Sequence, residues 1–341
     1  MGLILVGAHM TRHTNSHNGS FNRATHPRPG VAAPMPVRKL ARRWAATLRE
    51  RRARLGTATL HLVTDSLSAA VPPLPGVVLH SYESADPTDA ALTAIDVRWL
   101  AYLHVLSRVA PADDDCVFAI DSTDVGIIGN ASVLCERHPD AIYVGSDSCD
   151  PRKLATSLLE HARSAHLRLS PRVGLFFEDA AKGRLGIRPR EHPVYNAGIV
   201  GGRWRVWAPF VREVGRRIRA AARRAHGVGG GAHEVDMLVM NEMLLERRAQ
   251  GGHVHTGWPF GHVNLPMLSS FCDRSTCTRP PLTNDAAAAR EHNRKQGECM
   301  RRTMLGMAPN YFFVHKTAWL EHPTPLSRAM GWDDARPLER P

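Results

Sequence analysis

A chain of 341 residues with 43% hydrophobic residues can bury a sizeable core, as one large α/β domain or as two smaller ones. The formal net charge of +12 suggests a nucleic-acid partner, but only five of the 44 basic residues are lysine. The arginines are spread along helix-like segments without interleaved aromatic residues, which is typical of compositional bias. We therefore expect no nucleic-acid partner. No stretch approaches the apolar length of a membrane span, and the compartment, secretory lumen or cytoplasm, stays open.

The first half of the chain alternates between strand-like and helix-like segments. Four short apolar runs are typical of buried strands: residues 3–6, 59–64, 77–82 and 117–120. Two segments with apolar residues at helical spacing predict helices: residues 37–55 and 87–109. Asp86 is placed to cap the second helix, with Pro87 at its first position. The alternation predicts an α/β fold with a mostly parallel, Rossmann-like sheet and helices on both faces.

The second half is less regular but extends the same pattern. Strands are expected at residues 141–145, 194–202 and 311–314, and helices at residues 154–167, 204–225 and 234–248. Polar loops are expected at residues 10–36 and 272–303, and a proline-rich tail at residues 321–341. We therefore expect a single domain over residues 1–320.

Two aspartates, Asp121 and Asp124, follow the buried run at residues 117–120. Carboxylates at the tip of a buried strand are costly unless a cation or a donor lies between them. Oxygen ligands of this kind suit a hard divalent ion such as Mn²⁺ or Mg²⁺, which often holds a diphosphate. The alternative is a strand followed by an Asp-Ser turn, with Asp121 as a cap.

Glycines and cysteines leave further alternatives open. The small residues within 194–202, including Gly198, would let a ligand approach closely, or would mark a β-bulge or tight sheet packing. Six cysteines contain no CxxC pair, so a zinc ribbon is not expected. Cys272, Cys277 and Cys299 could form a disulfide or stay free. Asn18-Gly-Ser and Asn130-Ala-Ser match the glycosylation pattern, at a frequency expected by chance.

Four segments follow one another in an order that resembles the GT-A class of metal-dependent glycosyltransferases. They are the acidic pair Asp121 and Asp124, the Asn-Ala-Gly segment from Asn196, the Asp-x-x-x-x-Asn segment from Asp236, and the late pair His315-Lys316. The series is similar to that of the glycogenin-like transferases. The Asp-x-x-Asp spacing is closer to the glycosyltransferase domains of procollagen lysyl hydroxylases and to collagen galactosyltransferases. The resemblance spans residues 57 to 320.

The resemblance implies a GT-A fold and a role for each matched position. The implied ligands of Mn²⁺ or Mg²⁺ are Asp121, Asp124 and His315. Lys316 would contact the donor diphosphate, Asn196 and Gly198 would line the donor-sugar site, and Asp236 would be the catalytic residue near the anomeric carbon. Arg98, on the helix before the metal strand, is a further phosphate candidate, and the alternative for it is a solvated arginine.

The implied reaction transfers a hexosyl group from a nucleotide diphosphate sugar, with UDP-sugars favoured, to a hydroxyl of a sugar or protein acceptor. Retention of configuration is the expected outcome, because several of the resembled families retain. Three alternatives stay open. A nucleotidyltransferase could use a similar sheet and acidic pair. A non-catalytic, basic nucleic-acid-binding protein would explain the net charge alone. A degenerate transferase could bind without catalysing, because the Asp pair departs from the commoner Asp-x-Asp spacing.

Overall fold

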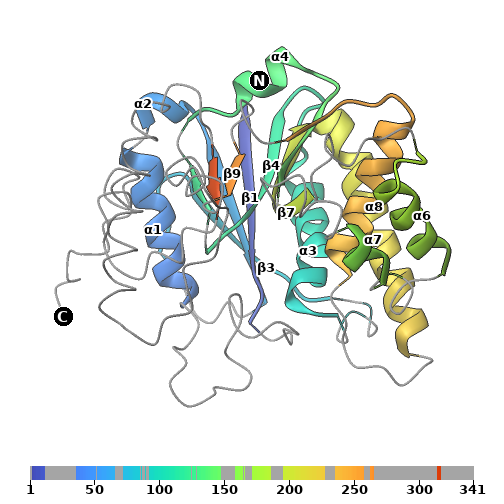
Figure 1. Ribbon diagram of the computed structural model, residues 1–341. Helices are drawn as coiled ribbons and strands as arrows, with labels where there is room; N and C mark the ends of the chain where they lie inside the picture. The colour runs from blue at the N-terminus through green and yellow to red at the C-terminus, as the bar shows by residue number, and fades with distance from the viewer. Residues whose placement is uncertain are drawn as a thin grey trace, which may run out of the picture.

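The computed structural model describes residues 2–11, 36–50, 52–65, 72–84, 86, 89, 92–123, 125–127, 129–146, 158–163, 165, 171–185, 195–226, 235–256, 262–264 and 313–315. These residues form an α/β fold around a seven-stranded sheet in the order β3-β2-β1-β4-β7-β6-β8 (Figure 1). The strands in that order are Val77–Ser81, Thr59–Thr64, Leu3–His9, Cys116–Asp121, Tyr195–Arg203, Ile142–Ser146 and Val254–Thr256. All neighbours are parallel except at β7, which is antiparallel to β4 and to β6. The predicted mostly parallel sheet is confirmed, and it is compatible with a Rossmann-like fold.

Helices cover both faces of the sheet (Figure 1). One face carries α1 (Val37–Glu50), α2 (Arg52–Leu55) and α4 (Ser132–Arg137), and the other carries α3 (Ala94–Val109), α6 (Pro171–Ala181), α7 (Trp204–His226) and α8 (Asp236–Ala249). Alternate residues of a strand supply the two cores. Leu3 and Leu5 pack into the cluster under α1, whereas Ile4 and Val6 pack into the cluster under α3. None of the described helices is long and apolar enough to span a membrane.

The helix expected from Pro87 begins later than predicted, at Ala94. Thr93 is its N-cap, and the Thr93 hydroxyl accepts a hydrogen bond from the backbone N–H of Asp96 at 3.2 Å. Asp86 does not cap this helix, because its carboxylate pairs with Arg223 of α7. The predicted first residue of the helix is therefore wrong, because the threonine that caps the helix, Thr93, lies seven residues after Asp86.

The glycines of β7 allow close packing of neighbouring backbones. A Cβ on Gly201 would lie 2.3 Å from the carbonyl oxygen of Val117 in β4, and one on Gly202 would lie 2.6 Å from the carbonyl oxygen of Ala141. The register of β6 on β7 shifts between Val144, opposite Val200, and Gly145, opposite Asn196, so the ladder is irregular there. Of the two structural explanations for this segment, tight sheet packing is confirmed, and the register shift is an irregularity of which a β-bulge is one form.

A second sheet of three short strands has the order β5-β10-β9: Gly126–Ile127, Phe313–His315 and His262–Asn264. Strand β10 runs antiparallel to β5 and parallel to β9. The polar loop at residues 272–303, the tail at residues 321–341 and most of the loop at residues 10–36 lie outside the described residues.

A disulfide joins Cys116, the first residue of β4, to Cys135 in α4. Both cysteines are fully buried, and their Cα atoms are 5.9 Å apart. The cysteine spacing does not predict this pair, because the bond depends on the packing of α4 against the sheet. Cys272, Cys277 and Cys299, the predicted candidates, lie outside the described residues.

Candidate functional site

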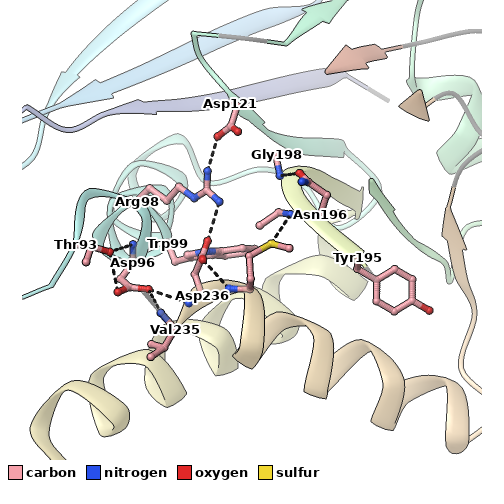
Figure 2. Close-up of polar contacts among 12 residues, drawn as sticks. Thr93, Asp96, Arg98, Trp99, Asp121, Tyr195, Asn196, Gly198, Val235 and Asp236 are labelled. Atoms are coloured by element: carbon pink, nitrogen blue, oxygen red, sulfur yellow. Dashed lines mark hydrogen bonds and ion pairs between the residues drawn. The ribbon is translucent and has the colours of Figure 1, made fainter. Parts of the chain in front are cut away.

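The side chain of Arg98 links two predicted site residues that are distant in sequence (Figure 2). One terminal nitrogen donates to Asp121, the last residue of β4, and the other donates to Asp236, the first residue of α8, at 2.8 Å. All three side chains are at most 8% exposed. The guanidinium therefore ties the carboxyl end of the central strand to the start of a helix. The alternative of a solvated arginine is wrong.

Asp236 has further partners that fix its orientation. Nε1 of Trp99 donates to the same carboxylate oxygen at 3.3 Å, and the backbone N–H of Met237 donates to the other oxygen at 2.6 Å. The residue after Arg98 thus contacts the same carboxylate as Arg98 does. Asp236 lies in the first turn of α8, where the helix dipole also favours negative charge.

Asp96 fixes the position of α8 relative to α3. Its Oδ1 accepts the backbone N–H groups of Val235 at 3.0 Å and Asp236 at 2.9 Å, and its Oδ2 accepts the Thr93 hydroxyl at 2.8 Å. Burial, and then the charge of Asp236, raise the pKa of Asp96 to about 8, although its hydrogen bonds act in the opposite direction. Sequence reasoning missed Asp96, but the capping spacing of Thr93 and Asp96 is a signal that could have found it.

The cluster of Arg98, Asp121 and Asp236 carries more negative than positive charge. Burial works to lower the pKa of Arg98, but the carboxylates of Asp121 and Asp236 outweigh it and raise that pKa, so Arg98 stays charged. Two carboxylates and one guanidinium leave a formal charge of −1. Asp96, with a pKa of about 8, adds little charge at pH 7. This count covers the three side chains of the cluster alone.

The start of β7 is held beside α8 by an amide side chain. Asn241 accepts the backbone N–H of Tyr195 at 2.7 Å and donates to the Tyr195 carbonyl at 2.9 Å. The backbone N–H of Ala197 donates to Sδ of Met237 at 3.3 Å, which places Asn196 next to the start of α8. The Asn196 side chain accepts the N–H of Gly198 at 2.8 Å. Figure 2 shows Asn196 and Gly198 on the side of Arg98 and Asp121, while the ring of Tyr195 points away.

The turn after Asp121 is supported from the opposite face of the sheet. Nε1 of Trp44 in α1 donates to the carbonyl of Ser122 at 2.8 Å, and Arg43 donates to the carbonyl of Thr123 at 3.3 Å. The Ser122 hydroxyl donates to the carbonyl of Ala8 at 2.8 Å. The backbone that follows the predicted metal ligand is therefore anchored by α1 and β1.

Three predicted residues are described in part or not at all. Asp124 and Lys316 lie outside the described residues. His315 is the last residue of β10, in which Val314 lies opposite Gly126 of β5. His315 itself lies opposite Asn264 of β9. The small sheet thus brings the end of β10 to the segment after Asp121.

Among the described residues, no group of three or more His, Cys, Asp or Glu side chains could hold a metal ion. That set does not include Asp124, so the predicted set of ligands stays a prediction. Comparison of the sequence with protein-family models finds no match, and a search of curated proteins finds none either.

Proposed function

We propose that this chain is a metal-dependent glycosyltransferase with a GT-A fold. It transfers a hexosyl group from a nucleotide diphosphate sugar, with a UDP-sugar favoured, to a hydroxyl of a sugar or protein acceptor, with retention of configuration. The observation that carries the proposal is the contact of Arg98 with both Asp121 and Asp236. This contact joins two of the predicted motifs, which are far apart in the chain, at the carboxyl end of strand β4.

The position of this contact supports a ligand site. In open α/β sheets, ligands bind beyond the carboxyl ends of the strands, and Asp121 ends the central strand β4. The neighbouring strand β7 is the one that reverses direction, and it brings Asn196 and Gly198 to the same place. Asn196 is 8% exposed and Asp121 is 6% exposed, so both place polar atoms below the surface of the protein at this point.

The donor set fits a hard divalent cation. Asp121 supplies carboxylate oxygens, and Asp124 and His315 are the further proposed ligands. A Mn²⁺ ion held there would supply positive charge to the diphosphate of the donor and to the departing nucleoside diphosphate.

The residues of the chain have separate proposed roles around the donor. Asp236, held by Arg98 and Trp99, would lie beside the donor sugar near its anomeric carbon, with Asn196 as a second contact. Lys316 would add a point charge at the diphosphate. Among the described residues, Nε of Arg98 is buried without a hydrogen-bond partner. Such a donor costs stability, roughly 1–3 kcal/mol, and a functional role of the arginine would account for that cost.

The test is a calorimetric titration of UDP and of GDP into the full chain, with and without Mn²⁺. We expect metal-dependent binding, stronger for UDP, that Asp121→Asn abolishes. Asp179→Asn is the matched control, because Asp179 lies on α6 and pairs only with the exposed Arg184 among the described residues. Mn²⁺-dependent release of UDP from a UDP-sugar would then report on catalysis. Absence of binding by either nucleotide with the metal present overturns the proposal.

A further inference from the structure

The sequence Asn130-Ala131-Ser132, which matches the N-glycosylation pattern, lies in a turn at the start of α4. Asn130 is half-buried, and its Oδ1 accepts the backbone N–H of Ser132 at 3.0 Å. That bond orients the side chain through its oxygen and leaves the role of glycan acceptor to Nδ2. Asn130 therefore combines the required pattern with a defined acceptor geometry.

The space beside this amide is bordered by a glycine. Gly56 is exposed, with φ +60°, and a Cβ placed on it would lie 4.0 Å from Nδ2 of Asn130. Apart from Gly56 itself and the residues on either side of it, no other heavy atom of the described residues lies within 4 Å of that Cβ position. Nδ2 of Asn130 thus faces a position of the chain that carries no side chain.

The disulfide is an independent sign of the compartment that glycosylates proteins. Cys116 and Cys135 enclose Asn130 in a loop with a sequence separation of 19, and Sγ of Cys116 lies 3.5 Å from the carbonyl oxygen of Ala131. Disulfides form and persist in secretory compartments and are rare in reducing ones. The bond depends on the packing of α4, whereas the glycosylation pattern depends on local sequence, so the two observations do not share a cause.

We propose that Asn130 carries an N-linked oligosaccharide, acquired in an oxidising secretory compartment where Cys116 and Cys135 become bonded. Nδ2 forms a bond to the anomeric carbon of an oligosaccharide and loses one proton. The bond from that carbon to a lipid diphosphate breaks, and the lipid diphosphate leaves. The two thiols lose two electrons and two protons to an oxidised dithiol enzyme by thiol–disulfide exchange.

The position of Asn130 keeps the glycan away from the candidate site. Asn130 lies near Gly56, which precedes β2, and near Cys116, which begins β4. Figure 1 shows α4 at the end of the sheet where β1 begins. Asp121 is the last residue of β4, so it lies at the opposite end of that strand from Cys116. The modification is therefore compatible with the proposed function but does not depend on it.

The experiment expresses the full chain with an added leader in a eukaryotic secretory host, in an Asn18→Gln background that removes the second matching pattern. Intact mass is measured before and after peptide-N-glycosidase treatment. We expect a loss of mass in this background and in Ser132→Thr, which keeps the pattern. Asn130→Gln and Ser132→Ala should show no loss. Ser132→Ala keeps Asn130 and the backbone N–H that it accepts, so it separates glycan loss from misfolding.

Two outcomes overturn the inference. One is a secreted, folded Asn18→Gln protein that has the mass of the bare chain. The other is alkylation of both Cys116 and Cys135 when thiols are trapped before any reduction, because it would show that the loop is not closed in that compartment. A cross-linked peptide pair from non-reducing digestion, together with the loss of mass, supports it.

Discussion

Replacement of Arg98 by methionine tests the centre of the candidate site. Methionine keeps most of the apolar stem of the side chain but leaves the carboxylates of Asp121 and Asp236 buried without their shared counter-ion. Removal of one partner of a buried ion pair typically costs about 3–5 kcal/mol, because an uncompensated charge stays inside. We expect Arg98→Met to fold but to lower Tm by on the order of 10 °C.

Thermal unfolding followed by circular dichroism measures this loss, and Mn²⁺ adds a second comparison. If Asp121 belongs to a metal site, Mn²⁺ should stabilise Arg98→Met more than the original chain, because the cation replaces the lost positive charge. A ligand at 100 times its Kd adds about 2.7 kcal/mol of stability. The double variant Arg98→Met, Asp236→Asn removes one carboxylate as well, and it should recover part of the loss.

Arg184→Met is the control for this experiment. The side chain of Arg184 is 66% exposed and pairs with Asp179 on the surface, so its removal should leave Tm unchanged within error. A fall in Tm for Arg98→Met no larger than that of Arg184→Met would refute the burial and pairing of Arg98. Equal stabilisation of both proteins by Mn²⁺ would refute the link between Arg98 and a metal site.

Three further measurements test other parts of the fold. Cys135→Ser opens a loop with a sequence separation of 19, and chain entropy predicts that the free energy of unfolding in urea falls by about 3 kcal/mol. A reductant should lower the stability of the original chain by the same amount and leave that of the variant unchanged. Burial, and then the charge of His80, lower the pKa of His61 to about 4, below its unfolded value near 6.5. The neutral form of His61 therefore contributes stability, on the order of 1–2 kcal/mol after solvent screening, that is fully present above pH 6.5 and is lost as the pH falls towards 4. In His61→Leu, the free energy of unfolding should change less with pH between 6.5 and 4 than it does in the original chain. Gly201→Ala places a methyl group 2.3 Å from a carbonyl of β4, so we expect a loss of more than about 2 kcal/mol in urea or failure to fold, whereas unchanged stability would contradict the close packing of β4 and β7.

Local pattern predicts six of the seven strands of the main sheet and misses the edge strand β8. The pattern predicts a strand over residues 59–64, which form β2 with the same bounds, and the apolar run that ends at Asp121 forms β4. Buried parallel strands are short, apolar and rich in β-branched residues, so each segment carries its own signal. The reversal of β7 has no such signal, because strand direction depends on which neighbours the strand pairs with.

The contacts of the candidate site depend on tertiary packing in the same way. Arg98 and Asp236 are 138 residues apart, and nothing local distinguishes Arg98 from the other arginines of the chain. Apolar periodicity does not predict which residues of α3 are buried, because the helix is buried on several sides and its buried residues include Asp96 and Arg98. These two polar residues are tolerated there because each has partners on α8.

The arginines of α7 show why net charge is a weak guide to partners. Arg217 contacts Glu242 and Glu246 of α8 at 2.9 and 3.1 Å, and Arg219 makes two bonds to the buried Asp89. Acidic residues of other elements therefore neutralise much of a helix that reads as strongly basic in sequence. A polyanion would have to displace these internal partners before it could bind the same guanidinium groups. The arginines of α7 thus contribute to packing between elements. A count of charges favours a nucleic-acid partner, but the pairing of these arginines with acidic residues gives that partner no support.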